Sequence, residues 1–413
     1  VGLIGTHFFF LAPLMHIGWN MWHPYVTPLD DWPGWIGKMA ILNAIGLLIY
    51  RGLRRAVPLR SQFQPLRIRN QMFPSVLATA LLVTFISQIY VYAQFGGILG
   101  FIQAYEAREG EFAGMGWIFT ISESFPILAL MGWTVYMQNR AKLPSWTTIA
   151  VVLIVFLILK LLFGGLRGSR SNTIWGLFWA VGIIHFVLRR FPKIVIYGGL
   201  VLVFLFMYAY GFYKAGGVAG LSALTDDYAQ TRLQRTYGRT VESLLLGDLG
   251  RADVQSYVLA RTADNESYYE LAMGRTYLGA VALAIPRSVW PERPPTKWWY
   301  GTQALYGQSL SRRSSNVYGL AGEGMLNFGP MGALIALGAF GILVGGIRRY
   351  LSGLAPGDIR WMIVPMVTIL CVTALVGDSD NIFFFLVKNG AIPLAVVWVA
   401  SSRRWHNPDL GLV

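Results

Sequence analysis

The sequence contains little charge and a single cysteine. Charged residues make up 13% of the 413 residues and hydrophobic residues 55%, whereas soluble domains carry about 25% charged residues. A water-soluble core cannot absorb this much apolar surface, so lipid must form part of the solvent. The one cysteine, Cys371, lies inside an apolar run, which excludes a disulfide framework and a cysteine-based metal site within one chain.

Nucleotide-binding motifs and histidine clusters are also missing. The chain has no Walker motif and no dinucleotide fingerprint, so an activated substrate or a gradient must drive any work that it does. All histidines lie outside residues 214–318, and they are His7, His16, His23, His185 and His406. This placement argues against a metal cluster or a histidine base in that segment, and we predict neither a metal nor a cofactor.

The net charge of +14 does not indicate a nucleic-acid partner. The basic residues adjoin hydrophobic stretches, so membrane topology explains them better. The chain begins at Val1 inside an apolar stretch and without methionine, so we expect further residues before it.

Ten apolar stretches approach the ~20 residues that a bilayer core requires. They cover residues 1–18, 35–50, 73–95, 115–137, 146–165, 172–188, 194–213, 319–347, 361–377 and 382–400. They predict an all-α, polytopic membrane protein with about ten or more spans. We expect seven transmembrane helices in residues 1–213, a large loop in 214–318, and three further helices in 319–413.

The distribution of Lys and Arg predicts the orientation of these spans. One set of connections carries 16 basic residues, whereas the opposite short connections carry only Arg108, Arg167 and Arg170. The basic set is expected in the cytoplasm, which places residues 214–318 on the outer side.

This outer segment is expected to contain two amphipathic helices and one rigid run. Apolar spacing predicts helices over residues 226–246 and 268–285. The proline-rich run 291–300 is expected to lie outside any helix interior. No internal repeat is visible, so the inverted-repeat signature of many secondary transporters is missing.

The outer turn at residues 164–172, Gly-Gly-Leu-Arg-Gly-Ser-Arg-Ser-Asn, is the first candidate site. Its glycines let backbone N–H groups approach a ligand, and a helix is expected to begin near Ser171. Arg167 and Arg170 grip phosphate bidentately, so the turn suits a pyrophosphate at the membrane surface. The alternative is a pair of interfacial arginines that bind lipid headgroups.

The second candidate site lies at the outer end of the span that begins near residue 319. Glu323 and Asn327 are four residues apart and therefore share one helix face. A carboxylate at that depth is costly unless it is paired or lines a wet cavity, and such a group suits a general base. Arg312, Arg313 and Asn316 precede it. The alternative is a structural pair of Glu with Arg.

The third candidate site lies within the outer segment. Arg275 and Arg287 are placed to clamp phosphate, and four aromatic side chains are placed to stack on sugar faces: Trp290, Trp298, Trp299 and Tyr300. The alternative is that these aromatic residues anchor the segment at the membrane interface.

Two further groups of charged residues have a structural interpretation. Asp378-Ser-Asp380 has the spacing of metal–nucleotide-sugar sites, and Asp30-Asp31 lies in another outer loop. Because nucleotide sugars are cytoplasmic, we expect solvated helix caps at both places. Lys160 and Lys388 lie in apolar spans, where each either reaches the outer cavity or pairs with an internal carboxylate.

These residues resemble the O-antigen and exopolysaccharide repeat-unit polymerases of the Wzy type. The resemblance covers roughly residues 150 to 345 and also rests on the large outer loop late in the chain. Its motifs are Arg-x-x-Arg at 167–170, Tyr277 followed by Ile285-Pro286-Arg287 and Pro291, and Gly322-Glu323 followed by Asn327-Phe328-Gly329 and Gly332.

The resemblance implies a GT-C-like fold and a metal-independent glycosyltransferase in the bacterial inner membrane, with its active site facing the periplasm or the outside. It implies transfer of a growing glycan from undecaprenyl pyrophosphate to a new lipid-linked repeat unit. The partners that it implies are the undecaprenyl-pyrophosphate-linked oligosaccharide, membrane lipid and a chain-length regulator protein.

Under this resemblance each candidate residue receives a role. The leaving pyrophosphate needs cations rather than a protonated acid, and Glu323 is the expected base for the acceptor hydroxyl. The catalytic set is Glu323, Arg167 and Arg170. The pyrophosphate-binding set is Arg167, Arg170, Arg275, Arg287, Arg312 and Arg313. The sugar-binding set is Tyr277, Trp290, Trp298, Trp299, Asn316 and Asn327.

Two other functions stay open. An O-antigen ligase shares the architecture, but such ligases typically carry a histidine near the start of the late span, where this chain has Ser314-Ser-Asn316. A transporter or flippase of lipid-linked oligosaccharide would need a continuous cavity and would form no glycosidic bond.

Overall fold

A computed structural model of the chain describes most of its residues. The described ranges are 2–22, 27–59, 63–69, 71–107, 115–140, 143–167, 170–216, 220, 225–226, 231, 240–263, 269–285, 289–307 and 316–402. Within these ranges the only strands are the two-residue antiparallel partners β1 (Arg67–Ile68) and β2 (Ser401–Ser402). The prediction of a helical protein is therefore confirmed.

Six helices are long and apolar enough to cross a membrane, by length and composition. They are Trp32–Ala56, Phe73–Gln94, Gly116–Asn139, Lys193–Tyr213, Gly319–Ser352 and Ser379–Val399. Apolar helices of 10–17 residues occupy Leu3–Trp19, Trp146–Leu162, Asn172–Leu188 and Val364–Val376. Each of the ten predicted stretches overlaps one of these helices, which together mark a helical membrane protein.

The chain forms two compact units, each assembled from segments far apart in sequence. The first unit comprises residues 1–59, 240–350 and 370–385. The second unit comprises residues 60–239, 351–369 and 386–413. Each buried cluster described below lies within a single unit.

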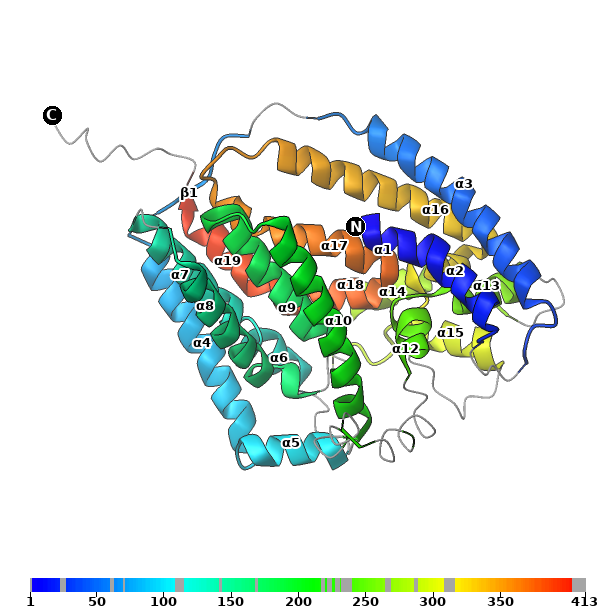
Figure 1. Cartoon of the computed structure of the whole chain (residues 1–413), viewed down its shortest axis with the longest axis horizontal. Helices are drawn as coiled ribbons and strands as arrows, with labels where there is room; N and C mark the ends of the chain where they lie inside the picture. The colour runs from blue at the N-terminus through cyan, green and yellow to red at the C-terminus, as the bar shows by residue number, and fades with distance from the viewer. Residues whose placement is uncertain are drawn as a thin grey trace. The chain divides into compact units, whose positions relative to one another are not determined.

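Two long helices of the first unit, α3 and α16, run side by side (Figure 1). Glycines allow this approach, since a Cβ on Gly341 would lie 2.6 Å from the backbone oxygen of Tyr50. The elements of this unit are α1 (Gly2–Thr6), η1 (His7–Leu11), α2 (Ala12–Trp19), α3 (Trp32–Ala56), α12 (Val241–Ser243), η6 (Leu244–Asp248), α13 (Ala252–Ala263), α14 (Arg275–Ala282), α15 (Lys297–Tyr306), most of α16 (Gly319–Ser352), and α18 (Ser379–Phe385).

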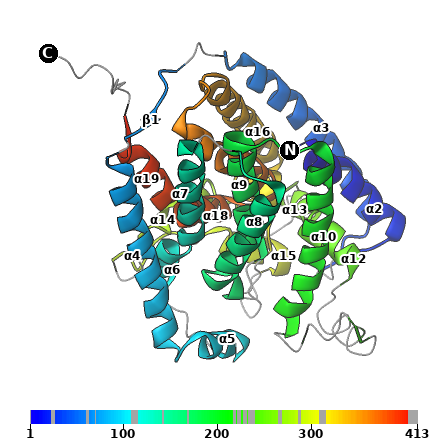
Figure 2. The ribbon, with the colours of Figure 1, turned by 60° about the vertical axis from the view of Figure 1, so that its left-hand side comes forward.

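The second unit packs α7 against α4, α8 and α9, and Figure 2 shows this group from the side. Its elements are α4 (Phe73–Gln94), α5 (Ile98–Ala107), α6 (Gly116–Ser122), α7 (Phe125–Asn139), α8 (Trp146–Leu162), η3 (Gly165–Arg167), α9 (Arg170–Ile183), η4 (Ile184–Leu188), α10 (Lys193–Gly216), η7 (Ile359–Met362), η8 (Leu386–Gly390) and α19 (Ala391–Val399). Helix α17 (Val364–Val376) is divided between the two units.

Two predicted spans contain a break that hydropathy does not reveal. Helix α16 is interrupted at Phe328 and Gly329, where Gly329 adopts a φ of +63° directly before Pro330. Proline removes a helical N–H and clashes with the preceding turn, which explains the kink. The candidate span Gly116–Asn139, predicted over residues 115–137, consists of α6 and α7 in succession, separated at Glu123 and Ser124.

The outer segment differs from its prediction in three places. The helix expected over residues 268–285 is shorter, because Gly274 with a φ of +85° precedes α14. The prediction that residues 291–300 lie outside any helix is wrong for the last four of them. Helix α15 begins at Lys297, after the last proline of the run. Of the helix expected over 226–246, residues 227–230 and 232–239 lie outside the description, Thr231 is helical, and α12 begins at Val241.

Candidate functional site

Glu323 lies in the first turns of α16 and is only 2% exposed. Its Oε1 accepts hydrogen bonds from the Thr276 hydroxyl (2.8 Å) and the Ser379 hydroxyl (2.5 Å). Its Oε2 accepts one from the Ser379 backbone N–H at 2.6 Å. Donors from α14 and α18 therefore fix the orientation of this carboxylate.

Asn327 lies one turn after Glu323 on the same face of α16, as the spacing predicts. Its Nδ2 donates to the Glu323 backbone oxygen (2.8 Å) and to the Thr276 hydroxyl (2.7 Å). Its Oδ1 accepts from the Gly274 backbone N–H at 2.9 Å. Asn327 therefore ties the start of α14 to α16.

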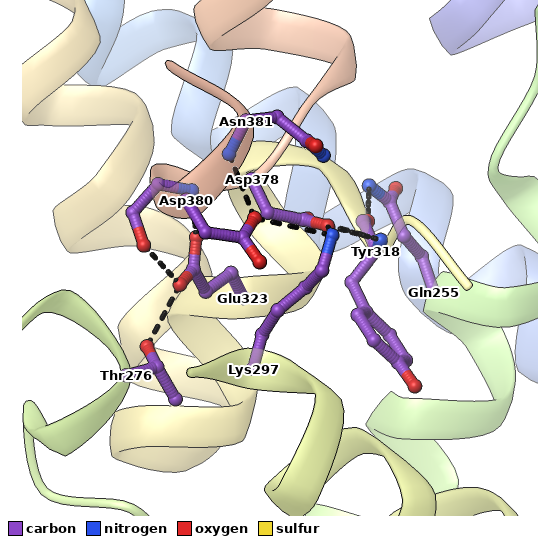
Figure 3. Close-up of polar contacts among 9 residues, drawn as sticks. Gln255, Thr276, Lys297, Tyr318, Glu323, Asp378, Asp380 and Asn381 are labelled. Carbon is purple, nitrogen blue, oxygen red and sulfur yellow. Dashed lines mark hydrogen bonds and ion pairs between the residues drawn. The ribbon is translucent and has the colours of Figure 1, made fainter. Parts of the chain in front are cut away.

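Lys297 forms a buried ion pair with Asp378 and a second pair, at 3.3 Å, with Asp380 (Figure 3). Burial alone would lower the pKa of Lys297, but the charges of Asp378 and Asp380 raise it above the usual value. The side chain is therefore a fixed ammonium. Asp378 also accepts a hydrogen bond from the Tyr318 backbone N–H at 3.0 Å.

The burial of Asp378 corrects one expectation and leaves another intact. Asp378 is fully buried, so its assignment as a solvated helix cap is wrong. It lies between α17 and α18, where Lys297 and the Tyr318 N–H replace water as its partners. Asp31, by contrast, is exposed and accepts from the Gly34 N–H at the start of α3, as a solvated cap does.

We refer to the group around Glu323 as the Glu323 cluster. Its members are Thr276, Lys297, Glu323, Asn327, Asp378, Ser379 and Asp380. Within it, Lys297 pairs with two carboxylates, Asp378 and Asp380, and hydroxyl groups bind the third, Glu323. Figure 3 shows Thr276, Lys297, Glu323, Asp378 and Asp380 converging from the ends of several helices.

An exposed cation lies beside this buried cluster. Arg275 directly precedes Thr276 on α14 and points to solvent, and a hydrogen bond with Tyr300 raises its pKa. Tyr277 follows, and its pKa is raised by burial and then by the charges of Glu323 and Asp378. The short helix α14 therefore joins an exposed guanidinium to buried carboxylates.

The remaining predicted site residues are only partly described. The backbone places Arg167 in η3 and Arg170 at the start of α9, and their side chains lie outside the description. Arg287, Arg312 and Arg313 also lie outside the described residues. Trp298 and Trp299 form an edge-to-face pair with ring centroids 5.7 Å apart, next to Lys297 on α15. Trp290 and Asn316 lie in non-helical segments.

A second buried group lies in the second unit, and we call it the Glu123 cluster. The Lys388 Nζ lies 2.8 Å from Glu123 Oε1, and the Lys160 Nζ lies 3.9 Å from Glu123 Oε2. Asn172 Nδ2 donates to Glu123 Oε2, and Lys160 Nζ donates to Asn389 Oδ1 at 3.4 Å. The interpretation of Lys160 and Lys388 as partners of an internal carboxylate is confirmed.

Sequence reasoning did not identify several residues of these clusters. Lys297 follows a proline-rich run that carries no sign of a partner 81 positions later. Glu123 had one available signal, because it is an acidic residue within a predicted span, where a charge is costly without a partner. Among the described residues, no group of three His, Cys, Asp or Glu side chains is arranged to hold a metal ion.

The chain was compared with protein families, curated proteins and solved structures. No family model, no curated protein and no solved structure matches the chain. The function is therefore argued from the residues and the geometry of the site.

Proposed function

We propose that this chain is a membrane glycosyltransferase that polymerises polysaccharide. It transfers a growing glycan from undecaprenyl pyrophosphate to a new lipid-linked repeat unit on the outer face of the bacterial inner membrane. The observation that carries the proposal is that exposed Arg275 and Thr276 are consecutive residues of α14, and that the Thr276 hydroxyl donates to buried Glu323. A phosphate leaving group needs a nearby cation, and an acceptor hydroxyl needs a nearby base.

The proposed reaction step uses Glu323 as the base and Arg275 as the cation. The acceptor hydroxyl oxygen bonds to the anomeric carbon of the donor sugar, while the bond from that carbon to the pyrophosphate oxygen breaks. The hydroxyl proton passes to Glu323 after the acceptor displaces a hydroxyl donor of Oε1, and the leaving electron pair stays on the pyrophosphate. Arg275 stabilises that developing charge, since guanidinium binds phosphate bidentately. The roles assigned to Arg167, Arg170, Arg287, Arg312 and Arg313 and to the aromatic residues remain predictions from the sequence.

The proposal includes an arrangement of the chain in the membrane. It takes the six long helices and the four shorter apolar helices as ten spans in a GT-C-like fold. It places the Glu323 cluster outside, because the positive-inside rule assigns residues 214–318 to the outer face.

Polymerisation by purified protein in lipid tests the proposal. The substrate is an undecaprenyl-pyrophosphate-linked repeat unit, and chain growth is followed as a ladder on a gel. We expect Glu323→Gln to lower the rate by about 10²–10⁴-fold and Arg275→Ala to lower it strongly, with partial rescue by Arg275→Lys. Exposed Glu292 supplies the matched control, and Glu292→Gln should retain the ladder. Full activity of Glu323→Gln would exclude it as the base.

A transporter of lipid-linked oligosaccharide is the second candidate, and one structural feature favours it. Helix α16 is broken at Phe328–Gly329, and Asp378 interrupts the path from α17 to α18, both close to buried charged groups. Broken helices of this kind line the substrate sites of many transporters. A Glu323→Gln variant that forms glycosidic bonds normally but fails to translocate substrate would favour the transporter. Transfer to lipid A core alone would favour a ligase.

A further inference from the structure

Helix α14 has one face that is buried and one that is not. Its buried face carries small residues, including Thr276, Gly279 and Ala280, and packs against α15 and α18. Its other face carries Leu278 and Val281, which are 53% and 60% exposed. An exposed apolar face of this kind marks a surface that binds something apolar.

The apolar surface extends beyond the helix on both sides. Met273 precedes α14 and is 68% exposed, and Val289 follows it and is 74% exposed. We call this surface the α14 patch, and its members are Met273, Leu278, Val281, Ile285, Val289 and Trp290.

The α14 patch adjoins the apolar surface of a candidate membrane helix. The N–H groups of Ala272 and Met273 donate to the backbone oxygens of Leu326 and Asn327, both at 3.0 Å. These two backbone hydrogen bonds place the start of the α14 patch next to the break in α16 at Phe328 and Gly329. Directly after the break, α16 exposes Met331 and Ile335, which face lipid if α16 spans the bilayer. The patch is therefore continuous with a lipid-facing surface.

A cation lies at the edge of the patch. Arg275 is on α14 between Met273 and Leu278, and its guanidinium is open to solvent. Apolar side chains with a basic residue at their edge are typical of helices that lie in the headgroup region of a membrane.

We propose that the α14 patch docks into the phospholipid leaflet next to α16. Leu278, Val281 and Val289 enter the acyl boundary, and Arg275 lies at the level of the lipid phosphates. The Thr276 hydroxyl that binds Glu323 is then two residues from a lipid-embedded side chain. This docking holds the Glu323 cluster at the membrane surface, and it does not depend on the reaction that the chain catalyses.

Spin labels in the full chain, reconstituted in nanodiscs of phosphatidylcholine and phosphatidylglycerol, test this inference. The only native cysteine, Cys371, is buried, and Cys371→Ala gives a clean background. Labels are placed through Leu278→Cys and Val281→Cys on the patch, Glu292→Cys as an exposed control in the same segment, and Ile335→Cys as the lipid reference. Collisions with oxygen and with a water-soluble nickel chelate then report the depth of each label.

We expect the patch labels to favour oxygen over nickel, as Ile335→Cys does, at a depth of about 5–10 Å. The Glu292→Cys label should favour nickel. Patch labels as open to nickel as Glu292→Cys would show that the face meets water and would overturn the inference. Dipolar coupling between labels on different molecules would assign the face to a second copy and would also overturn it. Val289→Cys tests the same patch outside the helix if substitution within α14 prevents folding.

Discussion

The Glu323 and Glu123 clusters bury charge in opposite proportions. In the Glu323 cluster, Lys297 pairs with Asp378 and Asp380, and the charge of Arg251 also acts on Asp378. Hydroxyl groups hold the third carboxylate, Glu323. In the Glu123 cluster, two lysines share one carboxylate, and its polar neighbours come from apolar helices of the second unit. Both arrangements avoid an isolated buried charge, which would cost several kcal/mol.

The difference between the clusters indicates different uses. The Glu323 cluster has an exposed cation next to it on α14 and carboxylate oxygens that accept from exchangeable hydroxyl groups. The Glu123 cluster joins the α6–α7 junction, α8, α9 and η8 through one central side chain. The proposed function assigns chemistry to the Glu323 cluster and structural support to the Glu123 cluster, and four measurements test this division.

Replacing each central carboxylate should separate stability from activity. Glu123→Gln leaves buried Lys388 and Lys160 without a carboxylate, and we expect a loss of about 3–5 kcal/mol in the free energy of unfolding. Glu323→Gln should change stability less, because the amide oxygen still accepts both hydroxyl donors and only the Ser379 N–H loses its acceptor, while activity falls. Chemical unfolding in detergent and polymerisation per folded molecule measure the two effects. Equal stability losses would remove the distinction between the clusters.

Lys297→Met should destabilise the first unit by about 3 kcal/mol, because buried Asp378 loses its ion-pair partner and keeps only the weaker influence of the Arg251 charge. Unfolding in detergent measures the loss. The double variant Lys297→Met with Asp378→Asn should recover part of it, since no buried pair then remains to be broken. No recovery in the double variant would mean that Lys297 acts through packing rather than charge.

Lys388→Met should cost less, about 1.5–3 kcal/mol, the range for a hydrogen bond to a charged group. Glu123 retains Lys160 and the Asn172 amide as partners, so its charge is not left isolated. Exposed Lys193 supplies the control, and Lys193→Met should leave stability unchanged. A larger loss for Lys388→Met than for Lys297→Met would reverse the proposed order.

The smallest effect concerns pH. The pKa of Lys297 is raised on folding, so its stabilising contribution is complete below the ordinary lysine pKa of about 10.4 and falls as pH rises through the folded value. The difference in unfolding temperature between wild type and Lys297→Met should be constant from pH 7 to pH 9 and shrink above about pH 10.4. A difference that grows above that pH would contradict the assigned direction of the shift.

Local patterns predicted the helices and one part of the Glu323 cluster. Hydropathy located all ten apolar segments, because a membrane helix satisfies its own backbone and reveals itself by composition. The spacing of Glu323 and Asn327 predicted a shared face, because residues four apart lie one turn apart on a helix. The breaks at Glu123 and Gly329 were missed, since hydropathy averages over a window wider than a single kink.

Contacts between residues far apart in sequence could not be predicted from local patterns. Lys297 binds Asp378 across 81 positions, and Lys160 reaches Asn389 across 229, and no local pattern specifies such pairs. The sequence by itself determined the helical membrane class, the apolar segments and the position of Glu323 on its helix, because each depends on neighbours within a few turns. Only the tertiary structure decided that Asp378 is buried and that Thr276 and Ser379 hold Glu323, because the desolvation of a charge depends on which distant segments surround it.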